Sequence, residues 1–107
     1  MKLRPYRADG SDVVSGYHHW CPACGQAHGI ATIKRTPSSP VWSFNGDLER
    51  PTFHPSVRCF HTDRDTGKQE TLCHYFVTDG QIVFCADNPH ELNGQTVPLP
   101  EFPASWG

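Results

Sequence analysis

Residues 71–85 read TLCHYFVTDGQIVFC, and this stretch decides the fold. Two runs rich in β-branched and aromatic residues flank an Asp-Gly pair, which is the strongest short-range signal for a β-hairpin because both turn positions need φ > 0. A two-residue turn sets the register of the two strands, so His74 should face Cys85. Side chains alternate along a strand, so Cys73 should point away from the face that carries His74.

Short β-type runs separated by turn residues continue outward from this hairpin, and no window shows a convincing helical stripe. We predict strands at residues 29–34, 41–45, 56–62, 70–78 and 81–86. One face of the central hairpin should form the core, with Cys73, Tyr75, Val77, Ile82 and Phe84. The expected fold class is mostly β: a small antiparallel sheet domain stapled by one zinc site, with little helix.

The composition explains why a staple is expected. Apolar residues make up 36% and charged residues 19% of the 107 residues, and both values lie below those of an average globular domain. We expect one domain over residues 1–107, with an N-terminal arm at 1–16 and a Pro-rich tail at 97–107. The tail should lie extended over an open sheet edge, with Leu99, Phe102 and Trp106 as its apolar contacts.

Charge and hydropathy exclude several classes of partner. The longest apolar run spans only residues 82–86, which is far shorter than a membrane span. The first residues lack the apolar segment of a signal peptide, so we expect a cytoplasmic protein with reduced thiols. The net charge is −2 and no basic run exists, so we expect no nucleic-acid partner.

Residues 21–25, CPACG, form the most specific motif in the chain. Two thiolates separated by two residues fold onto one metal in a tight turn, and thiolate is a preferred ligand of Zn²⁺. A redox C-x-x-C pair should instead open a helix in a thioredoxin-like unit, and no helical pattern follows this motif. We therefore predict Zn²⁺ bound by Cys21 and Cys24.

A closed zinc site needs two more ligands. Cys73 is the first candidate because it lies in a strand beside other chemically active residues, and His90 is the second because it directly follows the last predicted strand. His28 remains open, since its spacing from the C-x-x-C pair allows local closure. Cys59 and Cys85 should pack as small hydrophobic residues, and His61 should lie on the surface.

A serine, a histidine and an aspartate all occur in the second half of the chain. Ser56 follows a Pro-stiffened segment, His74 lies in the central hairpin, and Asp87 follows its second strand. Serine is a weak nucleophile that needs an imidazole to take its proton and a carboxylate to orient that imidazole. Ser56, His74 and Asp87 are therefore a candidate triad. The competing assignment places His74 on zinc with His90 as the base, and a third places a hydrolytic water on zinc itself.

Three ordered blocks of the chain resemble a known family. They read YHHWCPACGQAHGI at 17–30, WSFNGDLERPTFHPS at 42–56, and CHYFVTDGQI at 73–82 with Asp87 and HELNGQTV at 90–97. The blocks are similar to a family of small bacterial and prophage zinc-knuckle proteins, some of which carry the misleading label "ammonia monooxygenase". The resemblance covers most of residues 17–100.

The resemblance implies a function. Members of this family are encoded beside bacterial ubiquitination-like genes as peptidases that process or remove a ubiquitin-like protein. The matching positions in this chain are Cys21, Cys24, Ser56, Cys73, His74, Asp87 and His90. The first hypothesis is therefore a zinc-stapled serine peptidase whose partner is a ubiquitin-like protein or its conjugates. The alternative is a non-enzymatic zinc-binding interaction module, such as a phage accessory protein that binds a host factor.

Overall fold

The structure is a computed structural model that describes residues 1–105. Its strands are β1 (Arg4–Arg7), β2 (Val14–Cys21), β3 (Gln26–Ala31), β4 (Ser43–Phe44), β5 (Phe53–Thr62), β6 (Gln69–Thr78), β7 (Gln81–Phe84) and β8 (Thr96–Pro98). No helix occurs within residues 1–105, so this part of the chain holds no helix able to cross a membrane. The predicted mostly β fold is confirmed.

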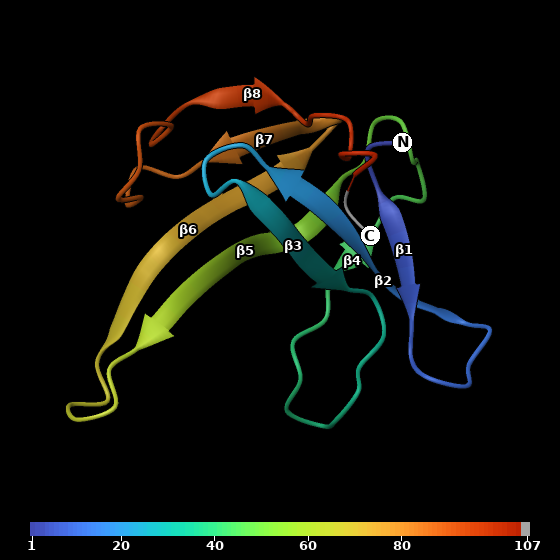
Figure 1. The fold of residues 1–107 in the computed structure, drawn as a ribbon, viewed down its shortest axis with the longest axis horizontal. Helices are drawn as coiled ribbons and strands as arrows, with labels where there is room; N and C mark the ends of the chain where they lie inside the picture. Colours follow the sequence, from blue (N-terminus) through green and yellow to red (C-terminus); the bar gives the residue numbers. More distant parts are fainter. Residues whose placement is uncertain (106–107) are drawn as a thin grey trace.

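The strands form two antiparallel sheets (Figure 1). A three-stranded sheet has the order β1-β2-β3, and a five-stranded sheet has the order β4-β5-β6-β7-β8. The long strands β5 and β6 curve together to a hairpin tip, and β2 and β3 cross in front of them in Figure 1. Ile30 of the first sheet, the adjacent Leu3, and Phe53 and Tyr75 of the second sheet belong to one buried cluster, so the two sheets share a core.

The central hairpin forms as predicted. Asp79 and Gly80 both have positive φ, 51° and 78°, and β6 pairs with β7 in the register that a two-residue turn dictates. Beyond the end of β7, Cys85 N–H still donates to the His74 carbonyl at 3.0 Å. The core face of the hairpin is buried throughout, with Cys73, Tyr75, Val77, Ile82 and Phe84 at most 2% exposed.

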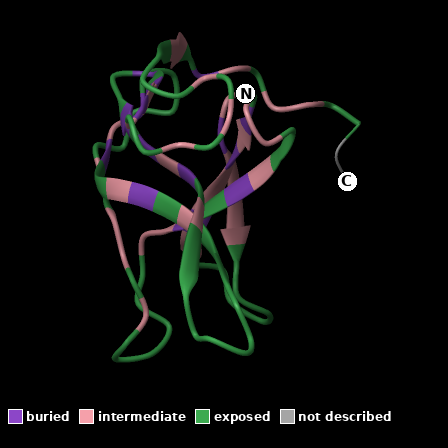
Figure 2. Ribbon diagram, turned by 90° about the vertical axis from the view of Figure 1, so that its left-hand side faces the viewer, coloured by how far each residue is buried: buried purple, intermediate pink, exposed green. Residues whose placement is uncertain are grey.

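Exposure is concentrated at the loop ends, and the buried residues gather where the two sheets meet (Figure 2). The β5–β6 loop is exposed along residues 61–70. The outer face of the five-stranded sheet also stays open, because Leu72 and Phe76 are 48% and 39% exposed on either side of His74 in β6. The site described below lies on this open face.

The structure contains three strands, β1, β2 and β8, that the sequence pattern did not predict. The expected N-terminal arm includes β1 and the start of β2, and Leu3 beside them is only 1% exposed. In the Pro-rich tail, β8 pairs with β7 and covers its edge, while Leu99 is buried and Phe102 packs on Trp20. Trp106, the third expected contact of the tail, lies outside the described residues.

Candidate active site and metal centre

Ser56 lies at an irregularity of β5. The ladder between β5 and β6 shifts register between Phe53 and Val57, which puts Ser56 in a bulged segment where side-chain direction can be reset. Trp42 Nε1–H donates to the Ser56 carbonyl at 3.1 Å and ties this segment to the residue before β4. Ser56 is therefore held from its backbone while its hydroxyl reaches toward β6.

The hydroxyl of Ser56 meets the imidazole of His74. Ser56 Oγ lies 3.0 Å from His74 Nε2, and His74 Nδ1 lies 3.0 and 3.1 Å from the two carboxylate oxygens of Asp87. With the ring proton on Nδ1 donated to Asp87, Nε2 is an acceptor for the Ser56 O–H. The structure thus brings together the three side chains named from the sequence, in the order that a serine nucleophile requires.

The carboxylate of Asp87 is well suited to orient the ring. The hydrogen bond with His74 lowers the pKa of Asp87 below its usual range, so this group stays ionised throughout the neutral range. Its side chain is 56% exposed, whereas that of His74 is 24% exposed. The pair therefore lies at the surface of the molecule.

Asn88 fixes the backbone of His74 and was not anticipated. His74 N–H donates to Asn88 Oδ1 at 2.7 Å, and Asn88 Nδ2–H donates to the carbonyls of His74 and Cys85 at 2.8 and 2.7 Å. The carboxamide thus pairs the His74 N–H beyond the end of β7, where the His74 carbonyl keeps its bond from the Cys85 N–H. The usable signal was an Asn four residues beyond the end of β7, because Asn side chains readily bond to backbone groups near such ends.

The predicted thiol cluster assembles on the opposite side of β6. The thiols of Cys21, Cys24 and Cys73 all lie within 4.8 Å of one another, and the Cys21 and Cys73 sulfurs are 3.9 Å apart. Two sulfurs bound to one tetrahedral Zn²⁺ at ~2.3 Å are separated by about 3.8 Å. Cys21 and Cys73 are fully buried. This cluster fits a metal ion.

His90, the second predicted ligand, contacts this cluster through Cys73. Its Nε2 lies 3.5 Å from Cys73 Sγ, and its ring packs edge-on against Phe84. Leu92 N–H points to the other ring nitrogen at 3.2 Å. A neutral imidazole that binds a metal through Nε2 carries its proton on Nδ1. If His90 bound a metal in this way, Nδ1 would become a donor, and the contact from Leu92 N–H would give way to one with an acceptor.

The three thiols of the cluster differ in pKa. The hydrogen bond with Cys73 lowers the pKa of Cys21 to about 6. Burial raises the pKa of Cys24 to about 11, and the same bond to Cys21, together with burial, raises that of Cys73 far above the usual thiol range. One thiolate is therefore present at neutral pH, and a bound cation would displace the other two protons.

His28, the open alternative ligand, has a different partner. His28 Nδ1 lies 3.0 Å from Tyr75 Oη, and His19 Nε2 lies 2.6 Å from the same hydroxyl. Burial lowers the pKa of His19 to about 3 and also lowers that of His28, so both rings are neutral. These histidines join the two sheets through Tyr75, and Cys59 packs beside His28 with 3.8 Å between sulfur and Nδ1.

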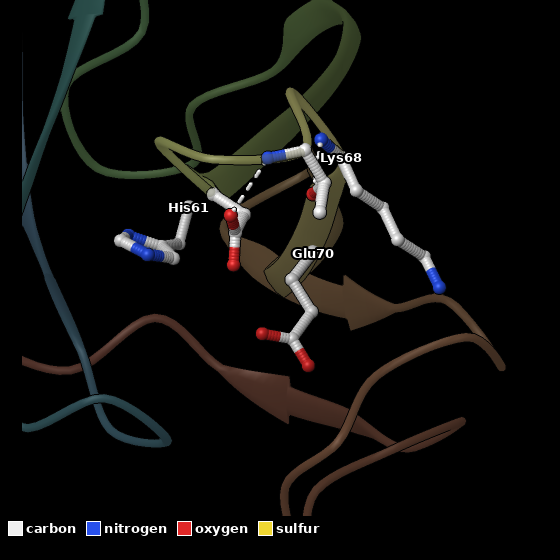
Figure 3. Close-up of a pocket in the computed structure, with 5 residues that line it drawn as sticks. His61, Lys68 and Glu70 are labelled. Atoms are coloured by element: carbon white, nitrogen blue, oxygen red, sulfur yellow. Dashed lines mark hydrogen bonds between the residues drawn. The ribbon is translucent and has the colours of Figure 1, made fainter.

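A hollow at the β5–β6 hairpin tip lies apart from both clusters (Figure 3). Asp63 there accepts the backbone N–H groups of Asp65 and Thr66 at 2.8 and 3.0 Å, which closes the turn. Figure 3 shows the exposed His61 and Lys68 side chains extending in different directions. These residues belong to the β5–β6 hairpin tip, and His61 lies on the surface as expected.

Comparison with known proteins identifies the family. The family model described as "Bacterial ubiquitination-like system serine protease (BubE)" matches residues 4–85. No curated protein and no solved structure matches the chain. The matched region includes Ser56, His74 and the three clustered thiols, and Asp87 lies two residues beyond its end. This chain belongs to the BubE family of serine proteases from bacterial ubiquitination-like systems.

Proposed function

We propose that this protein is a zinc-stapled serine peptidase that processes or removes a bacterial ubiquitin-like protein, with Ser56 as nucleophile, His74 as general base and Asp87 as the orienting carboxylate. The observation that carries the proposal is the line of hydrogen bonds from Ser56 Oγ through the imidazole to the carboxylate. The family's description as serine proteases of ubiquitination-like systems supports the reaction class and a protein partner.

The proposed chemistry follows from this line. Ser56 Oγ attacks the carbonyl carbon of the scissile bond while its proton moves to His74 Nε2. The imidazolium that forms is stabilised by the ionised Asp87, and its proton then passes to the leaving amine. Water repeats the steps on the acyl-enzyme and frees Ser56. No atom of the thiol cluster takes part in these steps.

The open face around His74 suits a macromolecular substrate. Leu72 and Phe76 lie two residues before and after His74 in β6, so the three side chains share one face. Both apolar side chains remain well exposed. An extended chain end of a protein partner can cover this face and reach Ser56 without first entering a deep cavity.

The thiol cluster has a structural role in this proposal. Cys21, Cys24, Cys73 and His90 would hold one Zn²⁺ in a closed four-ligand site, which supplies a cross-link between the sheets and leaves no open position for water. Because Cys73 and His74 are neighbours on opposite faces of β6, the strand that carries the base would also be fixed by the metal.

The test is cleavage of a bacterial ubiquitin-like precursor that carries a C-terminal extension. The wild type should release the extension, and Ser56→Ala should lower kcat by at least about a thousandfold. Ser43→Ala is the matched control, because among residues 1–105 the Ser43 hydroxyl hydrogen-bonds only to the carbonyl of His54, at 3.5 Å. Equal cleavage by wild type and Ser56→Ala would show that Ser56 is not the nucleophile, and no cleavage by the wild type would instead support the non-enzymatic interaction module.

A further inference from the structure

A second group of metal-ligating side chains surrounds the far side of the His74 ring. The ligand atoms of His74, Cys85 and Asp87 all lie within 4.8 Å of one another. Cys85 belongs to this group because it directly faces His74 across the hairpin, joined by the 3.0 Å bond from its N–H to the His74 carbonyl. The peptidase mechanism proposed above makes no use of the Cys85 thiol.

The spacing of these donors suits a transition metal. A nitrogen and an oxygen that bind one tetrahedral Zn²⁺ at ~2.0–2.1 Å are separated by about 3.3 Å. His74 Nδ1 and the Asp87 oxygens are already 3.0–3.1 Å apart. A small outward shift of the exposed carboxylate would therefore open the space for an ion.

The backbone of the site is fixed while its outer side is open. Asn88 Nδ2–H and Gly94 N–H both donate to the Cys85 carbonyl, at 2.7 and 3.1 Å, and Asn88 also holds His74. The Asp87 side chain is 56% exposed, so water can occupy a fourth position. Nitrogen, sulfur and oxygen donors with one open position form a set that Zn²⁺ accepts.

We propose that His74, Cys85 and Asp87 form a second, inhibitory Zn²⁺ site, separate from the cluster at Cys21 and Cys24. Binding forms bonds from Zn²⁺ to His74 Nδ1, Cys85 Sγ and an Asp87 oxygen. The thiol proton of Cys85 leaves to solvent, and the ring proton moves from Nδ1 to Nε2 through water. Nε2 then carries a proton and cannot take one from Ser56.

The binding part of this inference stands without the proposed function, and the inhibitory part rests on it. Binding is tested by equilibrium dialysis with Zn²⁺ on protein purified with its resident metal, at pH 7.5. The wild type should take up one further equivalent, and so should Ser56→Ala, which lacks only the nucleophile. Cys85→Ser should bind this equivalent at least about tenfold more weakly, since even loss of a group supporting a ligand has such an effect.

Cys59→Ser is the matched control, because Cys59 is a half-buried cysteine of β5 that lies in neither ligand group. It should bind the further equivalent like the wild type. His74→Gln should lose it, which provides a second ligand variant should Cys85→Ser fold poorly. No further equivalent in the wild type, or equal affinity in wild type and both ligand variants, would overturn the site.

The inhibitory part has its own readout. For each variant, the rate of substrate cleavage with added Zn²⁺ is divided by the rate without it. The wild-type ratio should fall with half-inhibition near the dissociation constant measured by dialysis, and Cys85→Ser should need at least about tenfold more Zn²⁺. Binding without inhibition in an active enzyme would refute the inhibitory role alone. If the protein binds the further Zn²⁺ equivalent but cleaves no substrate, the result contradicts the proposed peptidase function and leaves the metal site standing.

Discussion

Three contacts hold His74 in place. Its Nε2 meets Ser56, its Nδ1 meets Asp87, and its backbone is paired with the carboxamide of Asn88. A base that is fixed in this way needs little reorganisation when it takes a proton. Asn88 is therefore a positioning residue, which acts through His74 and does not itself reach Ser56.

Asn88→Ala should lower kcat by about tenfold or more with little change in KM, because His74 loses its partner at the strand end while the substrate face stays intact. Stability should fall by about 1–3 kcal/mol, because the His74 N–H is left unpaired and the carbonyls of His74 and Cys85 each lose one of two hydrogen bonds. Steady-state kinetics and thermal melts would measure both effects.

Asn45→Ala is the control for this prediction. The Asn45 side chain also makes three hydrogen bonds to backbone groups, those of Arg50, Asp47 and Thr52, in a loop away from His74. It should cause a similar loss of stability and leave kcat within about twofold. A similar fall in kcat for both variants would show that Asn88 acts only through general stability.

At the scale of elements, the β2–β3 hairpin presents the thiol pair. The turn between these strands closes with Gly25 N–H donating to the Cys21 carbonyl at 2.9 Å, and Gly25 has a φ of 65°, a conformation that favours glycine. This turn brings Cys21 and Cys24 within reach of Cys73 on β6. A local turn therefore supplies two ligands and the distant strand a third.

This arrangement predicts how many protons Zn²⁺ displaces. At pH 7.5 the Cys21 thiol, with a pKa of about 6, is ionised, whereas Cys24, at about 11, and Cys73 remain protonated. Adding Zn²⁺ to the apoprotein should release about two protons, and affinity should rise about a hundredfold per pH unit between about pH 7 and 10, because fewer protons then compete. An indicator-dye titration would measure the release; three protons would show that the apoprotein lacks the preformed cluster.

The same elements show what the sequence could predict. The Asp79–Gly80 turn determined the register of β6 and β7 without help from the rest of the chain, because turn length alone specifies it. The alternation of side chains along β6 also placed Cys73 and His74 on opposite faces of the strand. The strand β2 escaped prediction because the buried His19 on its inner face reads as polar, and Tyr75, the hydrogen-bond partner of its Nε2, is far away in sequence.

The triad shows the same limit. Residue types and order named Ser56, His74 and Asp87, but their distances depend on the bulge in β5 and on Asn88, which a sequence pattern does not display. For the fourth ligand of the proposed zinc site, spacing left both His28 and His90 open. In the structure His28 Nδ1 contacts Tyr75, a long-range contact between sheets, whereas His90 Nε2 lies 3.5 Å from Cys73 Sγ.

At the scale of the whole molecule, the thiol cluster lies between the two sheets. Cys21 and Cys24 belong to the hairpin of the three-stranded sheet, and Cys73 belongs to β6 of the five-stranded sheet. A metal bound there would join the two sheets, in addition to the hydrogen bonds that Tyr75 makes with His19 and His28. With an apolar content of 36%, the core is small, and the cross-link should contribute much of the folding free energy.

Removing the metal should therefore lower Tm strongly. A loss of about 3 kcal/mol corresponds to a fall of roughly 12–24 °C in a domain of about this size, and we expect at least this fall on chelation or in Cys73→Ser. Cys59→Ser is the matched control, because Cys59 directly faces Cys73 in the β5–β6 ladder but lies outside the thiol cluster. Melting curves that coincide with and without chelator would show that the fold does not depend on metal.

The central claim is that Ser56 is a nucleophile activated by His74, and covalent labelling tests it most directly because no substrate need be known. The protein is incubated with a fluorophosphonate, and intact and peptide mass spectrometry locate the adduct, with metal content measured in parallel. We predict one adduct per chain, on Ser56, that is abolished in His74→Ala while the metal content stays at the wild-type value. No adduct on Ser56, or equal labelling of wild type and His74→Ala, would contradict the account.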